Sequence, residues 1–271
     1  PASLVEKLIK YEAVHDIKSW GDVKNRLDSD RRCYGFFHPR LPDEPLIFVE
    51  VAFMNEIATN ISPLLDESAE AVDLSKATTA IFYSISNTQP GLKGVSFGDS
   101  LIKRVVETLR SDFPKLKTFA TLSPIPGFRG WLHKNAGHML EATPEKMRAQ
   151  LGRAVGFEPA GAEHVLSALE LMPTLPEKSA LRQWLQGCAA HYLGKELSQE
   201  RPIDPVARFH LGNGARVEQI NWAADMSSKG IKQSYGLMVN YLYDLRKIDR
   251  HRQALAQGRV PVSDAVSDLY F

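Results

Sequence analysis

The sequence predicts an α/β (α+β) protein with a mixed central sheet and a helical insertion. Three observations support this prediction. Short apolar segments rich in β-branched and aromatic residues occur in the first half of the chain. A succession of strand, loop, helix and strand spans residues 78–123, and a long stretch with helical apolar spacing covers 128–200.

Composition places the chain among ordinary globular proteins. Of its 271 residues, 44% are hydrophobic and 24% are charged. Because 33 basic residues face 32 acidic ones, the net charge of +1 argues against a nucleic-acid binder that depends on neutralising phosphates. The longest apolar runs, about ten residues, are too short to cross a bilayer. We therefore expect neither nucleic acid nor a membrane as a partner.

The first 53 residues predict helices followed by two strands. Apolar residues recur at helical spacing over 4–27, and we assign residues 1–30 to an N-terminal helical segment. A short strand is expected over 31–37. Three prolines in seven residues predict a loop over 39–45, and a buried strand is expected over 46–53.

Residues 78–123 form the most informative unit. An apolar strand over 78–86 precedes a turn-rich loop, and a second strand is expected over 116–123. Between them lies a helix whose apolar face follows i, i+3, i+4, i+7 spacing. That face comprises Ile102, Val105, Val106 and Leu109. The pattern is typical of a βαβ crossover between parallel strands.

The second half of the chain predicts mostly helices. Residues 128–200 carry two apolar faces at helical spacing, one of them made by Leu181, Trp184, Leu185 and Cys188. A strand is expected over 217–222. A final helix is expected over 234–250, with Leu237, Tyr241, Leu245 and Ile248 on one face. Little pattern remains after Gly258.

The loop Lys93–Asp99 joins a strand to a helix and contains two glycines. Glycines allow close approach of the backbone to a ligand, and a helix N-terminus offers unpaired N–H groups to an anion. Gly94 and Gly98 are four residues apart, so the loop matches neither the P-loop motif nor GxGxxG. An anion site and a plain strand–helix turn both remain open for this segment.

Two further residues are candidates for chemistry. Ser123 ends a strand, and the following Pro124 biases it to extended geometry. GxSxG is absent, so Ser123 is no nucleophile elbow, and a loop-capping serine is the alternative. His210 precedes Asn213-Gly214, which places a titratable group beside a turn, although a lone histidine is more often structural.

No metal site is expected. His133 and His138 have an awkward spacing for one helical face, and HExxH is absent. Cys33 and Cys188, the two cysteines, exclude a disulfide framework and a four-cysteine zinc site, and we expect free thiols. The basic pair Lys103-Arg104 is expected to be solvated or to meet a ligand phosphate.

Several strings together resemble the malonyl-CoA decarboxylase family. They occur in order over residues 12–250 and include FYSISNTQPGLKGVSFGDSLIKRVV from Phe82, LSPIPGF from Leu122, FHLGNGA from Phe209, INWAAD from Ile220 and GLMVNYLYDL from Gly236. The resemblance implies a GNAT-like acyl-CoA-binding fold with a splayed sheet over residues 31–271. It also implies that a helical domain, which assists homo-oligomerisation in the family, is missing from this chain.

The activity that this resemblance implies is conversion of malonyl-CoA to acetyl-CoA and CO₂, without a metal or organic cofactor. The family's catalytic serine and histidine fall on Ser123 and His210, and a further tyrosine falls on Tyr243. The CoA-contacting loop falls on Lys93, Gly94, Val95, Ser96, Phe97, Gly98 and Asp99. Family members can carry a glutamate in this loop where this chain has Ser96, so the role of that carboxylate does not transfer.

Two alternatives belong to other functional classes. One is a GNAT-type N-acyltransferase that moves an acyl group from CoA to an amine, for which an acceptor pocket has no distinct signal here. The other is a non-catalytic malonyl-CoA sensor.

No secretory signal or transit peptide is expected at the start, although Pro1 indicates a processed chain or part of a longer one. We expect a cytoplasmic location, with a mitochondrial one as the alternative.

Overall fold

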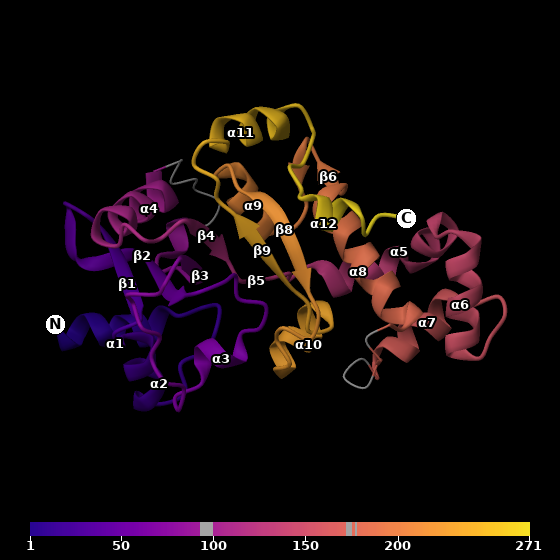
Figure 1. Cartoon of the computed structure of the whole chain (residues 1–271), viewed down its shortest axis with the longest axis horizontal. Helices are drawn as coiled ribbons and strands as arrows, with labels where there is room; N and C mark the ends of the chain where they lie inside the picture. The colour runs from indigo at the N-terminus through magenta and orange to yellow at the C-terminus, as the bar shows by residue number, and fades with distance from the viewer. Residues whose placement is uncertain (93–99, 172–174, 177) are drawn as a thin grey trace. The chain divides into compact units, whose positions relative to one another are not determined.

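The computed structural model describes residues 1–92, 100–171, 175–176 and 178–271. The chain divides into two compact units. The first unit comprises Pro1–Ser123 and Leu242–Arg246, and the second comprises Pro124–Tyr241 and Lys247–Phe271. The predicted α/β protein with a mixed sheet is confirmed, and Figure 1 shows the elements of both units.

The first unit is built on a mixed sheet. Its strands are β1 Arg31–His38, β2 Leu41–Met54, β3 Thr79–Asn87 and β4 Thr118–Thr121, in that order across the sheet. β1 and β2 are antiparallel, as are β2 and β3, while β3 and β4 are parallel. β3, α4 Ser100–Asp112 and the parallel strand β4 therefore form the predicted βαβ unit.

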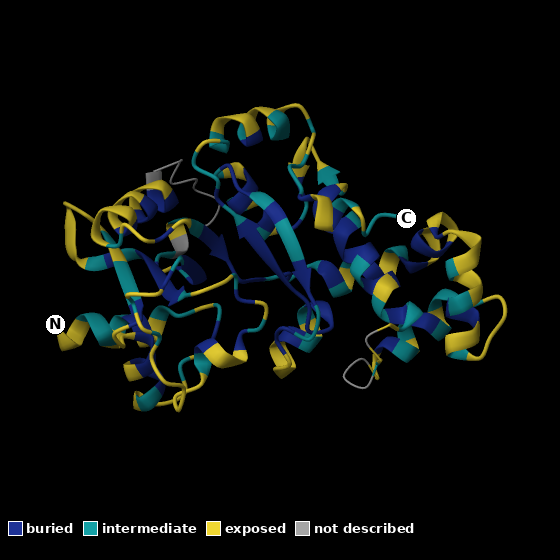
Figure 2. Ribbon diagram, in the orientation of Figure 1, coloured by how far each residue is buried: buried dark blue, intermediate teal, exposed yellow. Residues whose placement is uncertain are grey.

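Helices precede and connect these strands. They are α1 Ala2–Tyr11, α2 Trp20–Arg26, α3 Ser62–Leu65, the short 3₁₀ helix η1 Pro90–Leu92 and α4 Ser100–Asp112. The four apolar residues predicted on the helix after residue 99 are all buried in α4. Every residue from Ile47 to Phe53 is buried, so both faces of the sheet are covered along β2 (Figure 2).

Two expectations in the first unit are corrected. The stretch 4–27 is not one helical run, because the Glu12 side chain accepts hydrogen bonds from the backbone N–H groups of Val14 and His15 and interrupts the helix. The predicted loop over 39–45 is also wrong, since β2 already begins at Leu41. The prolines are accommodated where the β1–β2 register shifts, next to the exposed edge strand.

The second unit is mostly helical, as predicted. It contains α5 Phe128–Ala142, α6 Glu145–Val155, α7 Ala162–Leu169, α8 Ala180–Gly194, α9 Pro205–Gly212, α10 Ser228–Ser234, α11 Ile248–Ala256 and α12 Asp264–Ser267. The predicted face of α8 is entirely buried, and Trp184 donates a hydrogen bond to Thr143 at 3.0 Å. Short strands β6 Leu197–Ser198 and β7 Arg201–Pro202 form a hairpin, and β8 Arg216–Asn221 confirms the strand expected there.

The final helix expected over 234–250 is wrong. This stretch forms the strand β9 Met238–Leu242, which pairs with β8, and α11 begins only at Ile248. Tyr235 and Gly236 have φ values of 53° and 75°, which end α10 before the strand. A short apolar run buried on both sides cannot be distinguished from a helix by periodicity, and residues 238–241 are all buried.

The segment between the first two helices is held to the sheet by a buried ionic cluster. Arg26 is fully buried and bonds Asp22 at 2.7 Å, Glu50 of β2 at 2.9 Å and the carbonyl of His15 at 2.8 Å. The Ser84 hydroxyl of β3 donates to Glu12 at 2.7 Å. Burial, and then the charge of Glu12, raise the pKa of Glu50 to about 7.

Replacing Arg26→Met should destabilise the protein strongly, because it leaves buried carboxylates without their cation. We expect the free energy of unfolding to fall by about 3–5 kcal/mol in urea titrations. Lys24→Met on the exposed side of the same helix is the matched control and should stay within about 0.5 kcal/mol of the parent. A loss below about 1 kcal/mol for Arg26→Met would contradict a structural role for the cluster.

Candidate active site

Ser123 lies just beyond β4, the second strand of the βαβ unit. It follows β4 and opens the two-residue strand β5 Ser123–Pro124, with only 5% of the residue exposed. Its hydroxyl donates a hydrogen bond to the Thr121 hydroxyl at 2.9 Å. The two hydroxyls therefore meet where β4 ends and β5 begins.

Tyr243 lies beside β4. Its backbone N–H donates to the carbonyl of Phe119 at 2.9 Å, and its ring meets Phe82 edge-on with centroids 6.3 Å apart. Phe82 is the register partner of Thr121, to which Ser123 is bonded. Within the first unit, both residues thus adjoin β4, Tyr243 beside Phe119 and Ser123 beyond the last residue, Thr121. Burial raises the pKa of the Tyr243 phenol, which stays protonated and can donate a proton in a hydrogen bond.

His210 belongs to the second unit and lies on the short helix α9. Its ring stacks on Tyr241 with centroids 4.7 Å apart and meets Phe209 edge-on at 5.0 Å. Only 4% of the residue is exposed, and burial lowers the pKa of the imidazole to about 3. Burial disfavours the charged form, so His210 is neutral at physiological pH.

Asp204 determines where α9 begins. Its carboxylate accepts hydrogen bonds from the backbone N–H groups of Val206 and Ala207, both at 2.9 Å, and Pro205 occupies the first helical position. The same carboxylate accepts from the Tyr192 hydroxyl at 3.3 Å and from the backbone of Gly127. One buried side chain thus joins α9 to α8 and to the start of α5.

Gly127 is required at this junction for space. A Cβ atom there would collide with the Tyr192 hydroxyl, while its backbone φ of −94° is ordinary for any residue. The glycine therefore follows from a close approach and not from an unusual backbone conformation. Gly127 ends the Ser-Pro-Ile-Pro-Gly loop, whose two prolines stiffen the path from Ser123.

Some predicted site residues lie outside the described structure. The proposed CoA-contacting residues 93–99 are among them, and α4 begins directly after them at Ser100. Sequence reasoning missed Asp204, although Asp-Pro ahead of an apolar helix is an N-cap signal that could have revealed it. It also missed the contact between Tyr241 and His210, because Tyr241 was assigned to a helix.

A search of the described residues finds no group of three or more His, Cys, Asp or Glu side chains that could hold a metal ion. Cys33 is half-buried and Cys188 is buried, and both are free thiols, as expected. No helix in the described part of the chain is both long and apolar enough to cross a membrane.

The mixed sheet, the βαβ unit and the buried serine, tyrosine and histidine define an α/β protein with acid–base groups at strand and helix ends. The sequence matches the family described as malonyl-CoA decarboxylase C-terminal domain over residues 1–270, and the chain belongs to this family. The resemblance inferred from its motifs is thereby confirmed.

Named relatives agree with this assignment. A crystal structure of malonyl-CoA decarboxylase from Cupriavidus metallidurans is 52% identical, with a TM-score of 0.88, and the match covers 99% of this chain and 65% of that one. Mitochondrial malonyl-CoA decarboxylase of Anser anser anser is 40% identical over 90% of this chain, and that of Mus musculus is 40% identical over 91%. The chain spans 50% and 52% of these two proteins, about half of their length.

Replacing His210→Asn should reduce the acid sensitivity of the fold. A histidine with a pKa near 6.5 when unfolded and about 3 when folded binds its proton first in the unfolded state, so stability falls as pH falls through this window. On acidification from pH 7 to pH 4, this group should lower the free energy of unfolding by about 3 kcal/mol. The variant should not show that part of the decrease. Urea titrations at both pH values measure it, with the exposed His138→Asn as control.

Replacing Gly127→Ala should destabilise the second unit by about 1–3 kcal/mol through the clash with Tyr192. The double variant with Tyr192→Phe removes the clashing oxygen and should lose less than the sum of the two single variants. Gly130→Ala, three residues further along α5, has open space at its Cβ and should be neutral or stabilising. Additive losses in this double-mutant cycle would refute the close approach.

Proposed function

We propose that this chain carries the chemistry of malonyl-CoA decarboxylation, yielding acetyl-CoA and CO₂. Membership in the malonyl-CoA decarboxylase C-terminal domain family over residues 1–270 is the observation that supports this proposal. The proposal keeps the GNAT-like fold that the motifs imply, with the CoA-contacting loop at residues 93–99. In the full-length protein we further propose a homo-oligomer.

The reaction needs an electron sink and a proton. In malonyl-CoA the carboxylate is β to the thioester carbonyl. When the bond between C2 and the carboxyl carbon breaks, CO₂ leaves and the electron pair is delocalised from C2 onto the thioester oxygen. C2 then takes one proton to give acetyl-CoA. Because the substrate's own thioester accepts the electrons, we propose that no metal or organic cofactor takes part.

We assign His210 as the proton donor to C2. A buried neutral imidazole gains a proton when an anionic substrate carboxylate comes beside it, since opposite charge favours the imidazolium. Loss of CO₂ removes that carboxylate, and the low pKa of about 3 then makes the imidazolium a strong acid toward the enolate. After the transfer His210 is neutral again and regains its proton from solvent with the next substrate.

Ser123 and Tyr243 supply neutral hydrogen-bond donors in this proposal. Ser123 binds the malonyl carboxylate or the thioester oxygen and sets the geometry for cleavage of the C–C bond. Tyr243 keeps its phenolic proton because burial raises its pKa, so it can orient one of these groups. One donor to the developing oxyanion contributes about 10²–10³-fold in rate, and a general acid about 10²–10⁴-fold.

The location of the protein is also a proposal. The goose and mouse relatives are described as mitochondrial. We propose a cytoplasmic location for this chain, supported by its two free thiols, which suit a reducing compartment. Microscopy of the tagged full-length protein against a mitochondrial marker would test this.

Kinetics of three variants test the proposed chemistry. With malonyl-CoA as substrate, kcat should fall about 10²–10⁴-fold in His210→Asn and about 10²–10³-fold in Ser123→Ala. Tyr243→Phe should reduce kcat by a smaller factor, since it removes an orienting hydroxyl only. Release of acetyl-CoA and CO₂ is the readout, and circular dichroism confirms folding. Near-parental rates for both His210→Asn and Ser123→Ala would remove these residues from the chemistry.

The same assay separates the rival functions. Acetyl-CoA with a panel of amines should give no acylated product, whereas an N-acyltransferase would consume the thioester and release free CoA. Binding of malonyl-CoA without CO₂ release would identify a sensor instead of an enzyme.

A further inference from the structure

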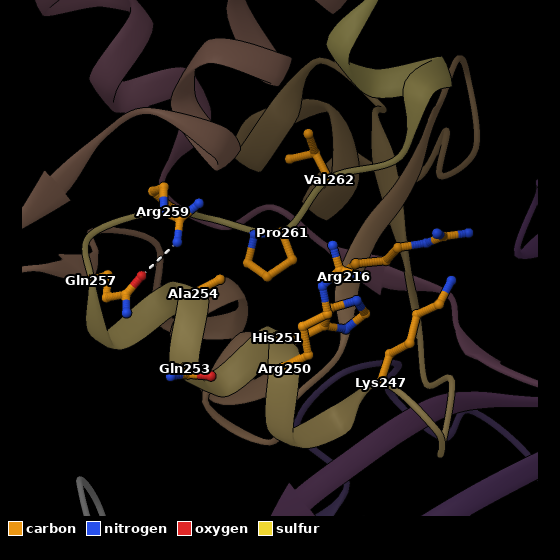
Figure 3. Close-up of a pocket in the computed structure, with 10 residues that line it drawn as sticks. All are labelled: Arg216, Lys247, Arg250, His251, Gln253, Ala254, Gln257, Arg259, Pro261 and Val262. Atoms are coloured by element: carbon orange, nitrogen blue, oxygen red, sulfur yellow. Dashed lines mark hydrogen bonds between the residues drawn. The ribbon is translucent and has the colours of Figure 1, made fainter.

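A basic cavity lies in the second unit, lined by α11, the segment that follows it and the first residue of β8. Its volume is about 520 Å³. Four cationic side chains line it, namely Arg216, Lys247, Arg250 and Arg259, together with His251 (Figure 3). Among the described residues that line this cavity, none carries a carboxylate. The family's expected CoA loop, at 93–99, lies elsewhere in the sequence.

One face of α11 is devoted to this cavity. Five lining residues follow i, i+3, i+4, i+7, i+10 spacing, which places them on one side of the helix and its two caps: Lys247, Arg250, His251, Ala254 and Gln257. A sixth, Gln253, falls outside this spacing and also lines a second cavity. A helix packed on a core carries apolar residues at such positions. Here the face carries positive charge and amides, a composition suited to a solvated or ligand-binding surface.

The acidic residue of α11 lies on a different side of the helix. Asp249 lines a second cavity of about 680 Å³, together with Glu200 and Arg252. Charge is therefore segregated on α11, with cations toward the basic cavity and a mixture of both signs toward the other. Such segregation concentrates positive potential in the basic cavity even though the chain as a whole has a net charge of only +1.

The cations differ in their present partners. Arg216 bonds Glu218 at 2.6 Å, and Arg259 donates to the side chain of Gln257. In Figure 3 the Lys247 side chain extends toward Arg216, and Pro261 lies between Arg216 and Arg259. The cavity thus combines charged walls with an apolar contribution from Pro261 and Val262.

We propose that this cavity binds a phosphorylated small molecule carrying at least two negative charges. Guanidinium groups present paired N–H donors that match phosphate oxygens, and lysine adds a mobile point charge. The volume lies within the range of about 300–1,000 Å³ that is usual for small-molecule sites. The apolar residues suit a nucleotide, whose ring can lie on them while its phosphates meet the cations.

Two sources can supply this chemistry. One is the phosphate-bearing end of the CoA thioester that we propose as substrate, in which case the inference depends on the proposed function. The other is a separate nucleotide that binds independently of the substrate. Both are phosphorylated ligands of the same cavity, and the experiment below distinguishes them.

The cavity wall also contacts the segment that follows the helix of His210. The His251 ring and the carbonyl of Gly214 form a hydrogen bond between Nδ1 and oxygen at 3.0 Å. Gly214 has a φ of 86°, and a Cβ atom there would lie 2.6 Å from the Ile248 side chain. α11 therefore packs directly against the turn at the C-terminal end of α9, so a bound ligand contacts an element that supports that helix.

Binding of inorganic pyrophosphate and of adenosine 3′,5′-bisphosphate, measured by isothermal titration calorimetry on the purified chain, tests the proposal. The double variant Lys247→Gln/Arg250→Gln should weaken binding at least about tenfold, and added salt should weaken binding to the parent. Arg252→Gln is the matched control because it removes one charge from the same helix but lines the other cavity. It should change the affinity less than about twofold.

Absence of binding up to about 10 mM ligand, near the weakest affinity expected of a specific site, would overturn the proposal. Equal weakening in Arg252→Gln would overturn it as well, since that result would mean unspecific attraction to a basic helix. Thermal denaturation establishes that each variant is folded. All these substitutions lie on the partly or fully exposed surface, so a folded double variant is expected.

Competition between pyrophosphate and acetyl-CoA distinguishes the two sources of the phosphorylated ligand. If the cavity binds the phosphates of the thioester, acetyl-CoA should displace pyrophosphate and the double variant should raise KM for malonyl-CoA without lowering kcat. If the ligand is a separate nucleotide, pyrophosphate should still bind at saturating acetyl-CoA and KM should be unchanged. A chain that binds pyrophosphate but releases no CO₂ from malonyl-CoA would refute the proposed function while the phosphate site stands.

Discussion

The Asp204 carboxylate is the interaction on which the arrangement of the second unit depends. α9 has eight residues, and an isolated helix of this length is marginal in water because nucleation costs more than so few hydrogen bonds return. Asp204 satisfies two of its N-terminal N–H groups and is itself held by Tyr192 and Gly127. The position of His210 is therefore determined by a buried polar junction and not by the intrinsic stability of its helix.

Burial of His210 links the stability of the fold to the chemistry that we propose for this residue. A ring enclosed by Tyr241 and Phe209 loses the hydration that an imidazolium needs, which lowers its pKa and makes the folded state sensitive to acid. The same environment suits a group that must carry a proton only while an anion lies beside it. An exposed histidine would hold part of its charge near neutral pH without substrate and would be a weaker acid toward an enolate.

The sequence predicts the βαβ unit and the α8 face well, because their spacing is long, regular and agrees with burial. The buried apolar residues lie on one side of the helix both in α4, from Ile102 to Leu109, and in α8, from Leu181 to Cys188. Around Tyr241 the prediction failed, since residues 238–241 are buried on all sides and such a run has no distinguishing period. Ser123, His210 and Tyr243 are assigned to the site by family motifs alone, whereas local patterns left structural roles open for Ser123 and His210. The contacts of Asp204 and Gly127 join segments some 77 positions apart in sequence, which no local pattern encodes.

The two ends of α9 are held in different ways, and the difference bears on how the second unit could respond to a ligand. At the N-terminal end Asp204 is fully buried and bonds buried groups of two elements, Tyr192 of α8 and Ala207 of α9. At the C-terminal end the support comes from α11, which carries the exposed Arg250, begins directly after the half-buried Lys247 and makes a close contact at Gly214. An anion bound by Lys247 and Arg250 would lower the mutual repulsion of these cations and stabilise α11 against the turn at Gly214. Since His251 bonds that turn directly, order gained in α11 would be transmitted to the end of α9 that lies nearest His210 in sequence.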